Sequence, residues 1–410
     1  SCVVTFIVEY NNLKLVTITT KISIIQYFAK VLTKLLLSSD NVKINKQYEG
    51  GSTLLHLAVE QEHKELVEIL LEVPGIDVNI KNNHGRTPLH TAIMIENLAA
   101  VNTLLEISNI NVNTQNNSRS TPPHTAIMTG NLAIVHALLQ IPGINVNIQN
   151  NNRSTPLHTA IMAGNLAIVN ALLKIPGINV NIQNNNRSTL LHLAIKIGSL
   201  AIVNRLLQIP GINVNIQDNH GFTLLHLAVK IGSLAIVNRL LQVSGINVNI
   251  QDNHGSIPLH LAVKIGNLDM VHALLKMSGI MINKKNRYYK RTPLHLASSI
   301  GDLVLVNRLL QHPEIKVNEQ DIFGFTALHR AAYEGHIEIV KRLLTDPNII
   351  VNRKDNRGAT SFDIATDKTH TEIARLLKEA SIKKTIKKEN LFVLTGQLIN
   401  FTVTWKYLPY

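Results

Sequence analysis

Hydrophobic and polar positions along this chain follow a pattern that predicts pairs of short helices joined by loops. In residues 153–181, "RSTPLHTAIMAGNLAIVNALLKIPGINVN", Thr155 is suited to cap a helix whose first position is Pro156. Gly164 supplies the left-handed residue that ends this helix. A second helix follows, with apolar residues at helical spacing: Leu166, Val169, Leu172 and Leu173. The stretch "PGINVNIQNNN" then breaks the helical pattern and predicts a protruding, hairpin-like loop.

The same unit recurs along most of the chain, and one histidine marks its register. This histidine returns every 34 residues, with a single step of 35, at His56, His90, His124, His158, His192, His226, His260, His295 and His329. A loosely matching unit precedes these nine and another follows them, so we count eleven units. No unit of this size buries its own apolar face. The pattern therefore predicts an all-α solenoid of stacked helix-turn-helix units.

The motifs "TPLHTA", "TPLHLA", "TALHRAA", "LAIVNALL" and "GINVN" resemble the ankyrin repeat over roughly residues 19–380. The resemblance implies an ankyrin solenoid with β-hairpin-like loops. We expect residues 1–18 to be an N-terminal extension, 19–380 the solenoid, with a polar last unit as its C-terminal cap, and 381–410 a basic and apolar tail. Three adjacent units depart from the pattern, because Arg119, Arg153 and Arg187 replace a loop glycine. Either each arginine adopts positive φ, at a cost of about 1 kcal/mol, or these loops re-form around neighbouring asparagines.

We interpret the recurring histidine as a structural residue and not as a catalytic or metal-binding one. A metal site needs several ligands converging on one ion, whereas this spacing places single histidines one repeat apart. The resemblance implies that each imidazole bonds the Thr-Pro turn and ties neighbouring loops together. We find no "HExxH", no "CxxC" and no Gly-rich phosphate loop, and the only cysteine is Cys2. We therefore expect a non-enzyme without catalytic residues, bound metal or cofactor.

Composition and charge restrict the possible fold and partners only slightly. The chain is 45% hydrophobic but only 4% aromatic, which suits a thin structure built from Leu, Ile, Val and Ala. A net charge of +13 indicates either plain solubility or an anionic partner. No window of about 18 uninterrupted apolar residues predicts a membrane span. The first residues match a signal peptide poorly, and they lack a starting Met, so a fragment of a longer protein stays an open alternative.

Two strips follow the end of the first helix from unit to unit. Four residues beyond the histidine lie Met94, Met128 and Met162, then Lys196, Lys230 and Lys264, and later Tyr333; five beyond lie Ile197, Ile231 and Ile265. The resemblance places these positions on the surface that ankyrin repeats use for partners. Methionines provide an adaptable apolar contact, and the lysines add charge. Recent duplication of one repeat would leave the same pattern, and the sequence does not separate the two explanations.

The loops add further candidates for binding. Phe222 replaces a small residue in "NHGFT", and the longer loop "KKNRYYKR", residues 284–291, combines five cations with Tyr288 and Tyr289. Cations interleaved with aromatics suit nucleic acid or an acidic protein surface, and a solvated insertion stays open. In the tail, lysines before an apolar segment suit an anionic membrane surface, or a plain extension.

We therefore expect a monomeric, non-enzymatic scaffold that binds a protein partner through its concave face and loop tips. Nucleic acid is a less favoured partner. Expansions of near-identical ankyrin repeats are similar to proteins of intracellular bacteria that act on host cells, which implies a host-directed effector. The expected location is the cytoplasm or a host cytosol. The alternatives are a basic surface that recruits nucleic acid or anionic membrane, and the targeting arm of a larger enzyme.

Overall fold

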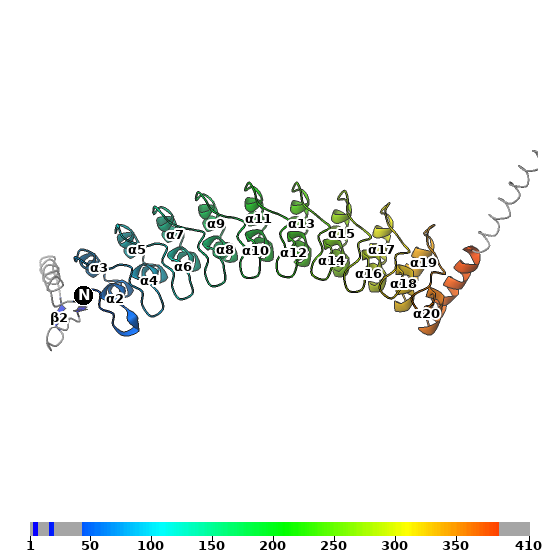
Figure 1. Ribbon diagram of the computed structural model, residues 1–410, viewed down its shortest axis with the longest axis horizontal. Coiled ribbons are helices and arrows are strands. Elements are labelled where there is room, and N and C mark those ends of the chain that lie inside the picture. Colours follow the sequence, from blue (N-terminus) through cyan, green and yellow to red (C-terminus); the bar gives the residue numbers. More distant parts are fainter. Residues whose placement is uncertain (1–2, 7–15, 20–42, 385–410) are drawn as a thin grey trace, which may run out of the picture. The chain divides into compact units, whose positions relative to one another are not determined.

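The computed structural model describes residues 3–6, 16–19 and 43–384. These fall into two compact units, residues 1–185 and 186–410, which we describe separately. In both units, first and second helices form two layers, and the loops extend from them (Figure 1). The ankyrin fold class predicted from the sequence is confirmed.

Unit 1 begins with two short antiparallel strands, β1 (Val3–Phe6) and β2 (Val16–Thr19), in which Val3 lies opposite Thr19. A 3-10 turn, Glu49–Gly51, precedes four helix pairs. These are α2 (Leu54–Glu60) and α3 (Lys64–Leu71), α4 (Pro88–Met94) and α5 (Leu98–Leu105), α6 (Pro122–Thr129) and α7 (Leu132–Leu139), α8 (Pro156–Met162) and α9 (Leu166–Leu172).

Unit 2 continues the same alternation. Its helices are α10 (Leu190–Lys196), α11 (Leu200–Leu207), α12 (Leu224–Lys230), α13 (Leu234–Leu241), α14 (Pro258–Ile265), α15 (Leu268–Leu275), α16 (Pro293–Ile300), α17 (Leu303–Leu310), α18 (Ala327–Glu334), α19 (Ile337–Leu344) and α20 (Ser361–Asp367). Residues 371–384 are also helical. In this last helix Arg375 pairs with Glu372 and Glu379, which gives the terminal repeat the polar surface expected of a cap.

In the repeat of residues 153–181, both helices start where the sequence predicts. Thr155 caps α8 by accepting a hydrogen bond from the N–H of His158, and Pro156 occupies the first turn. Asn165 caps α9 by accepting from the N–H of Ile168. The buried face of α9 differs from the prediction, because Leu166 is exposed. Ile168, Val169, Ala171 and Leu172 form that face.

Within each unit, first helices pack on first helices and second helices on second helices, so the core runs as one layer of aliphatic side chains. In unit 1, α4 contacts α6 and α6 contacts α8, while α5 contacts α7 and α7 contacts α9. Leu, Ile, Val and Ala make up nearly all of the buried apolar residues in the described part of the chain. This layer is thin enough to be filled without large rings, which explains the low aromatic content.

Asparagine side chains tie adjacent repeats together at the loop arms. In unit 1, Asn113 donates from Nδ2 to the carbonyl of Gly143 (2.9 Å) and accepts at Oδ1 from the N–H of Asn145 (2.8 Å). The same pair of bonds is made by Asn45, Asn79 and Asn147 in unit 1 and by Asn215, Asn249, Asn283 and Asn318 in unit 2. The abundant asparagines are therefore inter-repeat connectors as well as turn residues.

Glutamines form a second ladder nearer the loop tips. Gln115 donates from Nε2 to the carbonyl of Arg119 in its own loop (2.8 Å) and to that of Gln149 in the next repeat (3.0 Å). In unit 2, Gln217 and Gln320 do the same. Each loop is thereby closed on itself and fixed to its neighbour, because one amide satisfies two carbonyls.

Candidate interaction surface

The recurring histidine is bonded on both sides of its ring. His226 accepts at Nδ1 from the N–H of Thr223 (3.2 Å), the residue that caps its own helix. Its Nε2 lies 2.9 Å from the carbonyl oxygen of Ser256 in the next repeat. Because Nδ1 is an acceptor, Nε2 carries the proton and donates it to that carbonyl. In the described structure all nine histidines accept from the N–H of the residue that precedes their helix. Seven of them also place Nε2 within hydrogen-bond distance of a carbonyl oxygen in the next loop: His56, His90, His124, His192, His226, His260 and His295.

Burial keeps these imidazoles neutral. Desolvation lowers the pKa of His90, His192, His260 and His295 from 6.5 to about 4, although the carbonyl bond opposes the shift. A neutral, fully bonded and buried ring is poorly placed for proton transfer. Within the described residues, no group of three or more His, Cys, Asp or Glu side chains could hold a metal ion. The burial and bonding of these imidazoles agree with the structural role that we expect from the sequence.

In unit 1, the methionine strip lies at the ends of first helices and is exposed. The exposed fractions are 42% for Met94, 74% for Met128 and 58% for Met162. The helices that carry these side chains pack directly against one another, since α4 contacts α6 and α6 contacts α8. The strip is therefore a run of flexible thioether side chains available to an apolar partner.

In unit 2, the lysine strip is partly occupied by contacts within the chain. Lys196 lies 3.7 Å from the buried carboxylate of Asp218 and donates to Ser188. Lys230 lies over the ring of Phe222, 5.0 Å from its centroid, and that ring stacks on His226. Lys196 and Lys230 thus have a structural role in addition to the binding role predicted from the sequence. Lys264 is exposed, and no acidic side chain of the described residues pairs with it.

Isoleucines accompany the lysines on this strip. Ile197 is 37% exposed, Ile231 40% and Ile265 48%. An aliphatic side chain beside each lysine gives the strip a mixed apolar and cationic character. That combination suits a protein partner with acidic and apolar side chains.

The loop 284–291 and its neighbours form a second exposed cluster. Tyr288 and Tyr289 are exposed, and the ring of Tyr289 lies 6.5 Å from that of Phe323 in the next loop. From Phe323 the ring contacts continue to Phe325 (6.4 Å) and on to Tyr333 (6.1 Å). The structure therefore joins Tyr289 and Tyr333, which the sequence left as separate candidates.

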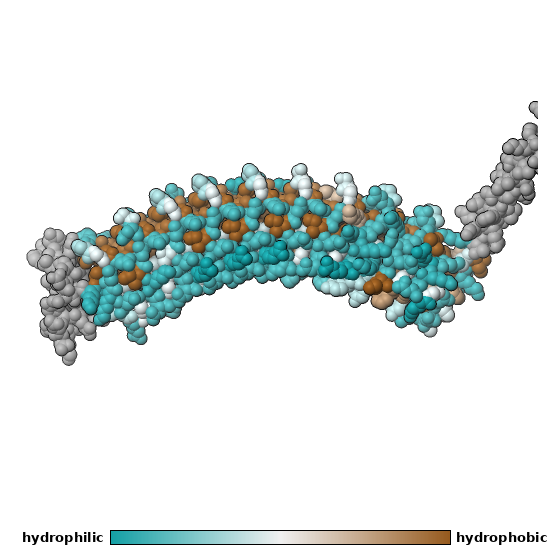
Figure 2. All heavy atoms as spheres, viewed as in Figure 1, coloured by the Kyte–Doolittle hydropathy of each residue, from teal (hydrophilic) through white to brown (hydrophobic). Residues whose placement is uncertain are grey.

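Ile322 and Phe323 are not among the candidates that the sequence predicted. Both are half exposed, at the tip of the loop that follows residues 284–291. On the loop side of unit 2, which is mostly hydrophilic in Figure 2, a hydrophobic spot lies beside α16 and α18. The signal was an apolar pair, "IF", at the loop position where the loops after α11 and α13 carry the polar pair "NH".

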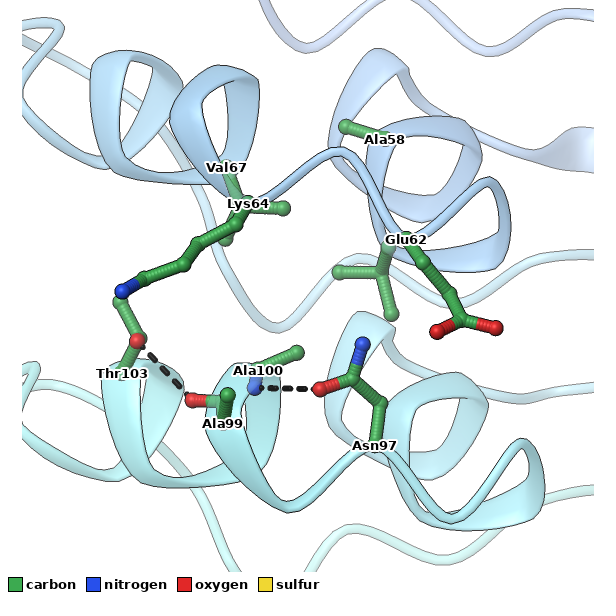
Figure 3. A pocket seen from close by; sticks show the side chains of 9 residues that line it. Ala58, Glu62, Lys64, Val67, Asn97, Ala99, Ala100 and Thr103 are labelled. Carbon is green, nitrogen blue, oxygen red and sulfur yellow. Dashed lines mark hydrogen bonds between the residues drawn. The ribbon is translucent and has the colours of Figure 1, made fainter. Parts of the chain in front are cut away.

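A small hollow lies between the first two described repeats, beside α3 and α5 (Figure 3). Its volume is ≈ 50 Å³, room for a few water molecules rather than a ligand. Two of the polar side chains that line it are bonded within their own helix, since Asn97 accepts from the N–H of Ala100 and Thr103 donates to the carbonyl of Ala99. This hollow is a packing gap.

The basic tail predicted as a membrane contact lies, beyond residue 384, outside the described residues. No helix in the described part of the chain is both long enough and apolar enough to cross a membrane.

A comparison with protein-family models agrees with the stacked helix pairs described above. A family model described as "Ankyrin repeats (3 copies)" matches residues 24–116, 99–184, 175–252, 191–286, 225–321 and 294–388. Among solved structures, the chain is similar to the crystal structure of the ankyrin repeat domain of Bcl-3, described as a unique member of the IkappaB protein family. The two are 29% identical, with a TM-score of 0.49, over 55% of this chain and 99% of that one. No curated protein matches.

Proposed function

Because this chain belongs to the ankyrin-repeat family, whose repeats are protein–protein interaction modules, we propose that it is a non-enzymatic scaffold that binds a protein partner. The binding surface is the exposed end of the first helices together with the loop tips. It acts as a monomer, in the cytoplasm or, as an effector, in the cytosol of a host cell.

One observation carries the proposal: large apolar side chains stay exposed, repeat after repeat, at two adjacent positions where the first helix ends. Met94, Met128 and Met162 repeat this in unit 1, as Ile197, Ile231 and Ile265 do in unit 2. Aligned exposed apolar side chains mark interaction sites on soluble proteins. Duplication explains why the residues are alike, but it does not remove the apolar surface that they present.

Lys264 and Ile265 provide the most direct test, because Lys264 pairs with no acidic side chain among residues 43–384 and Ile265 is half exposed. We expect the double variant Lys264→Glu/Ile265→Ser to fold normally and to lose a specific partner in a pull-down or proximity labelling in the native cell. The matched control is Lys276→Glu/Val304→Ser, which changes the same types of exposed residue on the second helices.

Retention of the whole partner set by the Lys264 and Ile265 variant would argue against this surface. Binding to nucleic acid with a steep salt dependence would favour the basic-surface alternative instead. Turnover by a longer natural form of the chain would identify it as the targeting arm of an enzyme.

A further inference from the structure

Four large side chains at two adjacent loop tips of unit 2 form a compact exposed surface, which we name the tip patch: Tyr288, Tyr289, Ile322 and Phe323. Their exposed fractions are 59%, 50%, 49% and 50%. The loop before them has Asn253 and His254 at the equivalent tip positions. A surface of this composition at one place in a row of polar tips indicates a binding site.

The tip patch is held rigid from below. The N–H of Ile322 donates to the carbonyl of Tyr289 (2.9 Å), which joins the two loops. Arg330 lies under Phe323, 5.6 Å from its centroid, and donates from Nε to the buried carboxylate of Asp321 (3.0 Å). Because the rings are already positioned, little side-chain entropy is lost when a partner binds.

A cationic hollow adjoins the tip patch. Its volume is ≈ 360 Å³, and Lys284, Lys285, Arg287 and Lys290 contribute to its lining. It also contains the carboxylate of Asp252, whose Oδ1 accepts two backbone N–H bonds, from His254 and Ser256.

Most of these cations have no acidic partner. Lys285 is neutralised by Glu319, 2.7 Å away. No acidic side chain of residues 43–384 lies within ion-pair distance of Lys284, Arg287 or Lys290. The hollow therefore presents net positive charge, and its cations lie in the loop that also carries Tyr288 and Tyr289.

We propose that the cationic hollow and the tip patch together bind an acidic peptide segment that carries a bulky apolar side chain next to its carboxylates. The proposal rests on the proposed function and names the chemistry of one partner. The carboxylates enter the hollow between Lys284, Arg287 and Lys290. The apolar side chain lies on Tyr289, Ile322 and Phe323.

The observations favour a peptide over nucleic acid. Ile322 is an aliphatic residue within the patch and has no ring on which a base could stack. The unpaired cations also belong to a single loop, whereas single-stranded nucleic acid is bound along an extended basic groove.

The test uses the full chain and fluorescence anisotropy with a short labelled peptide in which Leu-Phe is flanked by blocks of Asp and Glu. We expect binding that weakens by roughly tenfold or more in Arg287→Glu/Lys290→Glu and in Ile322→Ser/Phe323→Ser. A peptide with Lys in place of Asp and Glu, and one with Gly in place of Leu-Phe, should bind equally poorly to the unmodified protein.

Matched controls change the same residue types elsewhere in unit 2. Lys276→Glu/Lys316→Glu reverses two exposed lysines away from the hollow, and Val304→Ser/Ile350→Ser removes two side chains that are 57% and 47% exposed. Both should keep the affinity of the unmodified protein. Circular dichroism and thermal unfolding confirm that each variant is folded before its affinity is interpreted.

Equal affinity for the acidic and the basic peptide overturns the proposal. So does tighter binding of a single-stranded oligonucleotide that the Arg287 and Lys290 variant abolishes. If Lys264→Glu/Ile265→Ser loses the cellular partner while the tip-patch variants keep both partner and peptide affinity, the proposed function stands and this inference fails. Loss of the peptide in the tip-patch variants alone supports the inference independently of that partner.

Discussion

Arg119 occupies a backbone position where neighbouring repeats have glycine. Its φ is +56°, in the left-handed region, and Gly85 in the preceding loop has φ +70°. A Cβ on Gly85 would lie 2.4 Å from Oδ1 of Asn117 and 2.6 Å from its backbone nitrogen. The arginine loops therefore keep the glycine geometry. Of the two alternatives that the sequence left open, the positive-φ one is correct.

We expect Arg119→Gly to raise the free energy of unfolding by about 0.5–1 kcal/mol, because the left-handed conformation costs a side-chain-bearing residue more than glycine's extra chain entropy. The reverse change, Gly85→Arg, should lower it by more, because the new Cβ meets Asn117. Urea unfolding of both variants checks this. A loss of stability in Arg119→Gly would contradict it.

Individual residues show what the sequence was able to predict. Thr155 and Pro156 were identified because a cap and a first-turn proline depend only on local geometry. The inter-repeat roles of Asn113 and Gln115 were missed, because their partners lie about one repeat further along the chain. From the sequence alone, the asparagines and glutamines of the loops had no role beyond forming turns, because the residues that they bond belong to the neighbouring repeat.

At the scale of elements, the end of a first helix and the next loop are matched in charge. In unit 1, the next loop carries an asparagine 22 residues after each methionine: Asn116 follows Met94, and Asn150 follows Met128. In unit 2, the residue at the same spacing after Lys196 is Asp218, and the ammonium of Lys196 lies 3.7 Å from that carboxylate. The change from methionine to lysine at Lys196 and Lys230 therefore coincides with the change from asparagine to aspartate at Asp218 and Asp252, whereas Lys264 is followed at this spacing by Asn286 and departs from this match.

A double-mutant cycle tests this coupling. Lys196→Met should be destabilising, because it leaves the buried carboxylate of Asp218 without its cation. Adding Asp218→Asn should recover most of the loss, with a coupling energy of about 1 kcal/mol, since Lys196 is partly exposed. Asn still accepts the N–H bonds of His220 and Phe222 that Asp218 now receives. Additive single effects in urea unfolding would show that the two residues are independent.

This coupling explains why the candidate surface was only partly predictable. The exposed position of the strip was expected from the repeat frame together with the resemblance to ankyrin repeats. The intrachain partner of Lys196 and the exposed Ile322 depend on which side chain the neighbouring repeat presents, and a single repeat does not contain that information.

At the scale of the whole molecule, many buried histidines act together on stability. Desolvation lowers the pKa of His90, His192, His260 and His295 to about 4 in the folded chain, below the value of 6.5 for the free side chain. Between these values the unfolded chain binds more protons than the folded one. Stability is therefore fully present above about pH 6.5 and falls as the pH decreases towards 4.

Each of these four histidines accounts for up to about 3 kcal/mol of that loss. We expect the midpoint of urea unfolding to be constant from about pH 8 to pH 7 and to fall steeply below about pH 6. A midpoint that stays unchanged down to about pH 5 would mean that these imidazoles are not buried and neutral. Repeating the series in high salt separates this effect from surface charge.

The paired bonds of Asn45, Asn79, Asn113 and Asn147 have an evolutionary consequence. Every repeat of this series carries the asparagine side chain on one edge, and on the other edge the backbone carbonyl and N–H that the preceding asparagine bonds. A gene segment that encodes one complete period can therefore be copied or lost by recombination, and the flanking edges still fit. Lengthening such a protein requires no newly invented interface, which is how an array of near-identical modules grows.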